Sequence, residues 1–246
     1  MTVLAGKAAL VTGGSRGIGR AIVERLARDG AAVTFSYVRD AAAAEQVVAA
    51  VTDAGGAAWA EPCDLADGAQ LAKLFDAAER HTAGLDIVVN NAGVVALGLI
   101  ADTTDEQYDA VMDANAKGTF IAVREAARRL RDNGRLINIS TINTVSHGVG
   151  ISLYAGSKAA IEQFSVVAAH ELGPRGITVN VVSPGATDTD LLRTSNSAEA
   201  LAEMSALTPL GRLGQPPDVA DVVAFLAGPD GRWMTAQNLR ASGGLQ

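Results

Sequence analysis

A tyrosine and a lysine four residues apart, Tyr154 and Lys158, form the pair in this sequence best suited to acid–base chemistry. On a helix, residues four apart lie on the same face, so the two side chains would be neighbours. An ammonium group beside a phenol stabilises the phenolate and lowers the tyrosine pKa from its ordinary value of about 10. We therefore expect Tyr154 to exchange protons near neutral pH. Taken alone, such a pair is more often an ordinary feature of a helix surface.

A glycine-rich turn near the N-terminus is suited to binding phosphate groups. It reads Thr12-Gly13-Gly14-Ser15-Arg16-Gly17-Ile18-Gly19 and lies between the apolar segment 7–11 and the segment 21–27, whose apolar residues have helical spacing. A helix that begins at such a turn directs free N–H groups and its positive dipole end toward the turn. The arrangement predicts a dinucleotide-binding strand–turn–helix unit. A tight turn without a ligand remains the alternative.

Further polar residues follow predicted strands or interrupt a helical pattern. Asp64 follows the third strand, and the sequence Asn90-Asn91-Ala92-Gly93 ends the fourth. Asn115 lies inside a helical pattern, where asparagine is a mediocre helix former. A last group, Pro184-Gly185-Ala186-Thr187-Asp188-Thr189, follows the sixth strand. This order of motifs, with the Tyr-x-x-x-Lys pair after the fifth strand, is seldom produced by chance.

Strand-like and helix-like segments alternate along the whole chain. After the first strand, further strands are predicted at 32–37, 57–61, 86–90, 135–140, 177–183 and 238–241. Helical patterns occupy 41–54, 67–82, 104–131, 152–172 and 217–227. Near-continuous apolar strands are typical of a parallel sheet covered on both faces, and right-handed crossovers then give a doubly wound sheet. We predict an α/β fold, with one Rossmann-like domain over residues 1–246.

Residues 188–213 form the least regular stretch and follow the sixth strand. Ligands of doubly wound sheets bind near the carboxyl ends of the strands, so this stretch is placed to serve as a substrate lid. An ordinary surface excursion would have the same composition, and the sequence leaves the two interpretations open.

Composition excludes several classes of function. The 246 residues carry a net charge of −7 without a basic run, which argues against nucleic acid and anionic membranes as partners. No signal-peptide pattern and no apolar run of about 18 residues is present, so we expect a cytoplasmic protein. Cys63 is the single cysteine and the three histidines are scattered, which leaves no disulfide and no recognisable metal site.

Together these motifs resemble the short-chain dehydrogenase/reductase family, in the single-domain branch that includes 3-oxoacyl-acyl-carrier-protein reductases. The resemblance covers nearly the whole chain. It implies that Tyr154 is the general acid of carbonyl reduction, and that Lys158 tunes Tyr154 and binds ribose hydroxyls. Asn115 would hold a water in the proton relay. Thr141 stands thirteen residues before Tyr154, where the family usually has serine. Adjacent side chains of a strand point to opposite faces, so only one of Ser140 and Thr141 can face the substrate, and the spacing in the family implies that it is Thr141.

The resemblance also implies a cofactor site and usually a homotetramer. The implied cofactor residues are Gly13, Ser15, Arg16, Gly17, Ile18, Gly19, Asp64, Leu65, Asn91, Ala92, Gly93, Tyr154, Lys158, Pro184, Gly185, Thr187 and Thr189.

The end of the second strand should decide between NAD and NADP. An acid there bonds the ribose 2′-hydroxyl of NAD, whereas arginine accommodates the 2′-phosphate of NADP. By analogy the acid would stand at Tyr37, in the sequence Ser36-Tyr37-Val38-Arg39. Two cations, Arg16 and Arg39, and a hydroxyl favour NADP(H), although both arginines could be ordinary solvated charges. We therefore expect Ser36, Tyr37 and Arg39 to contact the cofactor directly. Asp40 is the competing carboxylate, and we expect it to be the N-cap of the following helix.

These observations predict an NADPH-dependent oxidoreductase that reversibly reduces a ketone to a secondary alcohol. A 3-oxoacyl thioester is one candidate substrate, because of the resemblance. A non-catalytic NADP-binding sensor or scaffold is the alternative, which loss of Tyr154 or Lys158 would have favoured. The candidate pocket residues are Val94, Ile142, Asn143, His147, Ile151, Ala186 and Leu191.

Overall fold

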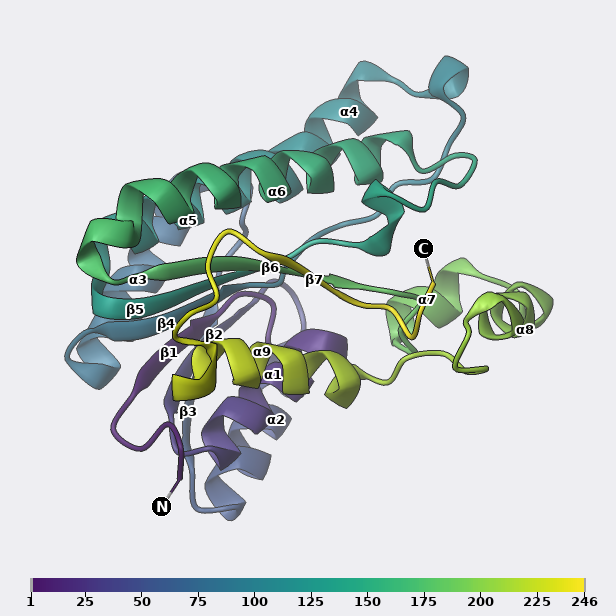
Figure 1. Ribbon diagram of the computed structural model, residues 1–246. Helices are drawn as coiled ribbons and strands as arrows, with labels where there is room; N and C mark the ends of the chain where they lie inside the picture. The colour runs from purple at the N-terminus through teal and green to yellow at the C-terminus, as the bar shows by residue number, and fades with distance from the viewer. Residues whose placement is uncertain (1, 246) are drawn as a thin grey trace.

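The computed structural model describes residues 2–245, which form a seven-stranded sheet in the order β3-β2-β1-β4-β5-β6-β7 (Figure 1). Every neighbouring pair of strands is parallel, as predicted. The strands are β1 (Ala8–Val11), β2 (Ala32–Tyr37), β3 (Ala57–Pro62), β4 (Leu85–Asn90), β5 (Leu130–Ile139), β6 (Thr178–Pro184) and β7 (Asn238–Ala241).

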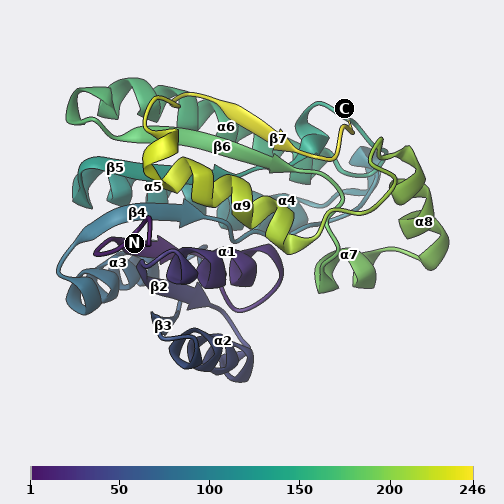
Figure 2. The ribbon, with the colours of Figure 1, turned by 60° about the horizontal axis from the view of Figure 1, so that its bottom comes forward.

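Helices cover both faces of this sheet (Figures 1 and 2). One face carries α1 (Gly17–Arg28), α2 (Ala41–Asp53) and α9 (Pro216–Ala227). The other carries α3 (Gly68–Thr82), α5 (Gly118–Arg129) and α6 (Ser152–Leu172). The short helices α4 (Asp105–Val111), α7 (Asp190–Ser195) and α8 (Ala198–Leu207) complete the set. In Figure 1, α7 and α8 lie beyond one end of the sheet.

The two apolar faces explain why the strands are hydrophobic without alternation. In β1, Ala9 and Val11 pack on the α1, α2 and α9 side, whereas Leu10 packs on the opposite side. All three are fully buried. Burying one large aliphatic side chain stabilises the fold by about 1.5–3 kcal/mol, so both layers contribute to the stability of the sheet.

The strand order creates the site's location. The chain proceeds outward from β1 through β2 to β3 and then returns to pair β4 with the other side of β1. The loops after β1 and β4 therefore diverge at neighbouring carboxyl ends, which is where doubly wound sheets bind ligands.

One predicted helix is divided in the structure. The pattern over 104–131 forms α4, a π-helical turn (Met112–Lys117) and α5. A π-helical turn inserts an extra residue into the helix, and such turns occur frequently at functional sites. The stretch 188–213 is more regular than predicted, because it contains α7 and α8.

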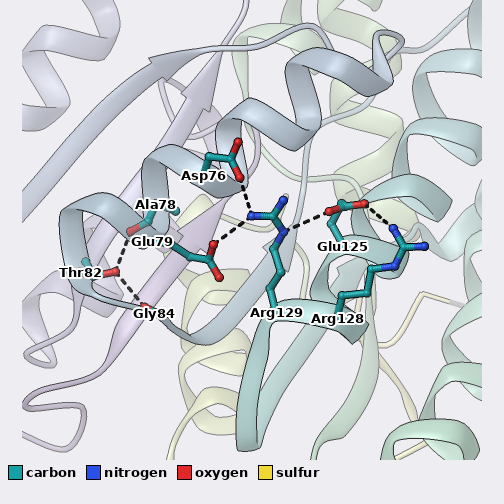
Figure 3. Close-up of polar contacts among 8 residues, drawn as sticks. All are labelled: Asp76, Ala78, Glu79, Thr82, Gly84, Glu125, Arg128 and Arg129. Atoms are coloured by element: carbon teal, nitrogen blue, oxygen red, sulfur yellow. Dashed lines mark hydrogen bonds and ion pairs between the residues drawn. The ribbon is translucent and has the colours of Figure 1, made fainter.

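An arginine ties α3 to α5 (Figure 3). Arg129 of α5 contacts Asp76 at 2.6 Å and Glu79 at 2.9 Å, both on α3. It also contacts Glu125 on its own helix at 3.1 Å. Glu125 is buried, so this network is less screened by water than a surface ion pair. The network fixes α5, which continues directly from the π-helical turn.

No helix in the described part of the chain has both the length and the apolar character needed to cross a bilayer. Among residues 2–245, no three His, Cys, Asp or Glu side chains gather closely enough to hold a metal ion.

Candidate active site

The glycine turn between β1 and α1 leaves no room for side chains on its inner surface. Gly13 has a φ of +70°, a conformation that favours glycine. A Cβ atom at Gly19 would lie 2.0 Å from the Gly13 carbonyl oxygen. One at Gly17 would lie 3.2 Å from the Thr189 Cγ2 atom. The turn therefore presents backbone at the start of α1, as close approach of a pyrophosphate requires.

Thr12 and Asn91 connect this turn to the end of β4. The Asn91 amide donates to the carbonyl oxygens of Thr12 at 3.1 Å and Gly13 at 3.2 Å. In return, the Thr12 hydroxyl oxygen accepts from the backbone N–H groups of Asn91 at 3.0 Å and Ala92 at 3.1 Å. Sequence reasoning missed Thr12. Its position at the strand end, directly before the first glycine, is the signal that could have identified it.

Ser36 supports the same turn from β2. Its buried hydroxyl oxygen accepts from the Gly13 N–H at 3.0 Å, and its carbonyl oxygen accepts from the Gly14 N–H at 2.8 Å. This role differs from the direct cofactor contact expected of Ser36.

The residues predicted to discriminate between cofactors lie at the end of β2 and in the glycine turn. Arg16 and Arg39 are exposed, and Tyr37 is half-buried. Within residues 2–245, neither arginine lies at ion-pair distance from a carboxylate. The prediction for Asp40 is confirmed, because its side chain accepts from the Ala43 N–H at 2.9 Å as the N-cap of α2. The Asp40 carboxylate is therefore engaged in capping α2.

Tyr154 and Lys158 lie one turn apart on α6, as predicted. The Lys158 side chain is buried, and its Nζ atom donates to the carbonyl oxygen of Ile139 at 2.9 Å. The same Nζ atom lies 6.0 Å from the centroid of the Tyr154 ring. Burial lowers the pKa of Lys158 from 10.5 to about 8, because the interior penalises the charged form.

The expected lowering of the Tyr154 pKa is wrong for this structure. Burial raises the pKa of Tyr154 above its ordinary value, and hydrogen bonding with Thr141 only partly opposes this effect. The phenolate is penalised by loss of water, while Lys158 already donates to a backbone carbonyl. Tyr154 is therefore protonated at neutral pH, the state of a proton donor.

Asn115 is fully buried in the π-helical turn and bonded to three groups. Its Oδ1 atom accepts from the Val94 N–H at 2.8 Å, and its Nδ2 atom donates to the Val94 carbonyl oxygen at 2.8 Å. Nδ2 also donates to the Ser157 hydroxyl oxygen at 3.0 Å. A Cβ atom at Gly93 would lie 3.1 Å from Asn115 Oδ1 and 3.2 Å from Lys158 Nζ. Asn115 and Lys158 thus meet beside Gly93.

Thr141 and Ser140 point in different directions at the end of β5. Thr141 has an extended backbone, and its hydroxyl oxygen accepts from the Asn143 N–H at 3.3 Å. The Thr141 side chain also interacts with Tyr154, which partly opposes the rise in the pKa of that phenol. The Ser140 hydroxyl instead donates to Glu162 of α6 at 2.6 Å. The structure therefore brings Thr141, and not Ser140, to Tyr154.

The predicted adenine residues follow β3. Asp64 is exposed, and its carboxylate accepts from the Ala66 N–H at 3.0 Å. The Leu65 side chain is buried in the core, which leaves its backbone as the group available to a ligand.

The loop after β6 faces the glycine turn. Pro184 is buried at the strand end, and the Thr187 hydroxyl donates to the Gly185 carbonyl oxygen at 3.0 Å. The Thr189 hydroxyl oxygen caps α7 by accepting from the Leu192 N–H at 3.3 Å. A cavity of about 320 Å³ opens outside the turn. It is lined by Gly17, Arg20, Ala21, Glu24, Asp188, Thr189, Asp190, Pro216 and Pro217.

These residues fit a nicotinamide dinucleotide. The glycine turn would receive the pyrophosphate, and the loop after β6 would lie beside the nicotinamide. The narrow space at Gly93, which a Cβ atom would fill, leads to Lys158 and Asn115. Among the predicted pocket residues, Ile142 is buried, whereas His147 and Leu191 are exposed.

Comparison with known proteins places this site in a family. The family model described as enoyl-(acyl carrier protein) reductase matches residues 13–246. An uncharacterized oxidoreductase of Methylorubrum extorquens is 44% identical, and the match covers 100% of both chains. A short chain dehydrogenase from Burkholderia cenocepacia, solved in complex with NADP, has a TM-score of 0.94 and 41% identity over 99% of each chain. The angucycline C-6 ketoreductase LanV, with bound NADP, has a TM-score of 0.94 and 40% identity, covering 99% of this chain and 96% of LanV. The protein thus belongs to the short-chain dehydrogenase/reductase family of oxidoreductases.

Proposed function

We propose that the protein is an NADPH-dependent reductase that converts an uncharged ketone to a secondary alcohol, reversibly. The observation that carries this proposal is the convergence of Thr141, Tyr154, Lys158 and Asn115: Thr141 interacts with Tyr154, and Lys158 and Asn115 meet beside Gly93. They come from the segment after β5, from α6 and from the π-helical turn.

The chain's own residues would orient the substrate and move the proton. Bound NADPH supplies the hydride for the carbonyl carbon. The Thr141 hydroxyl would donate a hydrogen bond to the carbonyl oxygen, and the Tyr154 phenol would protonate that oxygen. The raised pKa of Tyr154 keeps the phenol protonated and ready to donate. Lys158 would bind the ribose hydroxyls of the cofactor, and Asn115 would hold a water molecule of the proton relay.

Two observations support NADP(H) as the cofactor. Arg39 is exposed just after β2 and Arg16 is exposed in the glycine turn, and no acid stands at Tyr37, so a 2′-phosphate would meet positive charge. In addition, the similar short chain dehydrogenase and LanV structures were solved with NADP.

The substrate-facing loops support an uncharged, apolar substrate. The loops before α4 and α6 meet through a 2.9 Å bond from the Gly98 N–H to the Gly150 carbonyl oxygen. Apart from Asp102 and His147, their large exposed side chains are aliphatic: Val94, Leu97, Leu99, Ile100, Val145 and Val149. We propose that residues 188–213 form a substrate lid, which adds a third surface to those of the two loops. Its exposed apolar side chains are Leu191, Leu207 and Leu210.

The charge of this lid argues against a carrier-bound 3-oxoacyl thioester, which brings a phosphate group. The lid has two arginines against four carboxylates. Both arginines are paired, Arg193 with Asp188 and Arg212 with Asp218. An anionic substrate would therefore be repelled.

A substrate panel tests this function. NADPH oxidation is measured at 340 nm with polycyclic aromatic ketones, aliphatic ketones, an acetoacetyl thioester and a ketoacid. We expect the highest kcat/KM with an uncharged cyclic or aromatic ketone. Turnover of the acetoacetyl thioester above all the ketones would reject the substrate class, and no turnover of any carbonyl despite NADPH binding would reject the function.

We also propose that the protein assembles as a homotetramer. The outer surfaces of α5 and α6 carry Phe120, Val166 and Val167, all exposed, and Phe120 packs edge-to-face on Phe164 at 5.3 Å. Such an apolar surface is typical of a helix–helix interface. Light scattering should give four times the 25.1 kDa chain mass, and a monomer at micromolar concentration would reject the proposal.

A further inference from the structure

We propose that Glu162 is a positioning residue, which fixes the Thr141 hydroxyl relative to Tyr154 through the two neighbouring hydroxyls of Ser140 and Thr144. This inference rests on the proposed function, since it concerns the same acid–base site. It assigns a role to a carboxylate that no motif in the sequence indicates.

The geometry centres on one carboxylate oxygen. Glu162 Oε1 accepts from the Ser140 hydroxyl at 2.6 Å and from the Thr144 hydroxyl at 2.8 Å. Ser140 is buried, and Glu162 and Thr144 are half-buried, so these bonds are partly shielded from water. Hydrogen bonds to an ionised acceptor are about twice as strong as neutral ones.

The two bonds bracket Thr141. Ser140 precedes it at the end of β5, and Thr144 ends the short 3₁₀ turn (Ile142–Thr144) that follows. The Thr144 hydroxyl also lies 3.1 Å from the Thr141 carbonyl oxygen. Both flanks of Thr141 are thus anchored to a single side chain of α6.

The anchoring helix is the one that carries the proton donor. Glu162 lies four residues after Lys158 and eight after Tyr154, all on α6. The Lys158 carbonyl oxygen also lies 3.5 Å from the Ser140 hydroxyl. Glu162 therefore sets the distance between the segment after β5, which carries Thr141, and the helix that carries Tyr154. A misplacement of about 1 Å in such a site can cost about 10²-fold in rate.

Two substitutions of Glu162 distinguish a role as hydrogen-bond acceptor from a role through charge or packing. Glutamine keeps an Oε1 acceptor at the same distance from the backbone, whereas leucine fills similar space and accepts no hydrogen bond. Glu162→Gln should therefore preserve the position of Thr141, and Glu162→Leu should lose it. Glu171→Leu, at an exposed site near the end of the same helix, controls for the change from glutamate to leucine.

The first readout is steady-state kinetics at saturating NADPH with a ketone that the wild type reduces. We expect kcat of Glu162→Leu to fall about 10²-fold, with the KM for NADPH unchanged. The kcat of Glu162→Gln should stay within about threefold of the wild-type value, because the acceptor that positions Thr141 is kept. Glu171→Leu should match wild type. Undiminished turnover in Glu162→Leu, or an equal loss in Glu162→Gln, would overturn the proposal.

The second readout does not depend on turnover. Crystal structures of the wild type, Glu162→Leu and Glu162→Gln should show the Thr141 hydroxyl displaced from Tyr154 only in Glu162→Leu. If it stays in place there, Glu162 does not position it and the proposal fails. A wild type that reduces no carbonyl, together with a displaced Thr141 in Glu162→Leu, would instead reject the proposed function while supporting this placement.

Discussion

The side chain of Asn115 and the backbone of Val94 are joined by two hydrogen bonds of 2.8 Å, one in each direction. This pair closes the π-helical turn against the loop that leaves β4. The position of the loop after β4 therefore depends on the π-helical turn between α4 and α5.

Replacing Asn115 by alanine should destabilise the protein. The Val94 backbone would lose two hydrogen bonds and the fully buried Ser157 hydroxyl would lose its donor, and an unpaired buried polar group costs about 1–3 kcal/mol. Urea denaturation should show a loss of about 2 kcal/mol or more in the free energy of unfolding. As a control, Asn196→Ala loses one bond, to the Leu192 carbonyl oxygen, in the segment between α7 and α8. Similar losses in both variants would contradict a special role for the Asn115 pair.

Tyr154→Phe should nearly abolish reduction while leaving NADPH affinity close to that of the wild type. The change removes the proton donor and keeps the ring. Turnover is followed by NADPH oxidation and binding by NADPH fluorescence. The same change at Tyr108, which is exposed on α4, should have no effect on either. A Tyr154→Phe enzyme with most of its turnover would show that another group protonates the substrate.

The buried Lys158 should make stability depend on pH in the alkaline range. Its pKa is lowered from 10.5 unfolded to about 8 folded, so between these values the unfolded chain binds more protons. The free energy of unfolding of the wild type, relative to Lys158→Met, should therefore rise from about pH 8 to 10.5. The rise should reach up to about 3 kcal/mol, at about 1.4 kcal/mol for each pKa unit. Lys73→Met, at an exposed site on α3, should give no such slope. If the difference in free energy of unfolding between the wild type and Lys158→Met did not change with pH, the lowered pKa of Lys158 would be refuted.

The cofactor preference should follow the charges near β2. We expect a higher kcat/KM with NADPH than with NADH, and Tyr37→Asp should shift the preference toward NADH because a carboxylate repels the 2′-phosphate. Arg39→Ala and Arg16→Ala should each lower kcat/KM for NADPH about 10-fold, since a charged hydrogen bond contributes about 1.5 kcal/mol or more. NADH kinetics and the exposed Arg28→Ala variant serve as controls. A wild type that prefers NADH would reject the assignment.

Thr141→Ala should be more harmful than Ser140→Ala. Loss of a donor aimed at a developing oxyanion typically costs about 10²–10³ in kcat. Thr141→Ser keeps the hydroxyl and should be tolerated. Ser140→Ala removes one of the two donors to Glu162, so a smaller loss is expected. Steady-state kinetics at saturating NADPH would reveal a register error if Ser140→Ala were the slower enzyme.

The sequence predicted the parallel sheet because the strands are apolar on both faces, and α6 was predicted with its bounds correct. It could not predict the division of 104–131, because the π-helical turn is accompanied by bonds from Asn115 to the loop after β4 and to Ser157 of α6. It assigned Tyr154 to a phenolate-stabilising environment from the spacing to Lys158. The burial that raises the Tyr154 pKa is a tertiary property, which spacing does not encode. Glu162 was missed for the same reason, since it acts through partners on other elements. Thr12 also acts through another element, but its position directly before the first glycine could have identified it.

The Gly98–Gly150 contact joins the loop after β4 to the segment between β5 and α6. That segment carries both Thr141 and the exposed Val149, whereas the loop after β4 carries the exposed Leu99 and none of the acid–base residues. Part of the substrate-facing surface can therefore vary without changing an acid–base residue. Grafting residues 95–104 from a relative should transfer substrate preference as a cassette, leaving Thr141, Tyr154 and Lys158 in place.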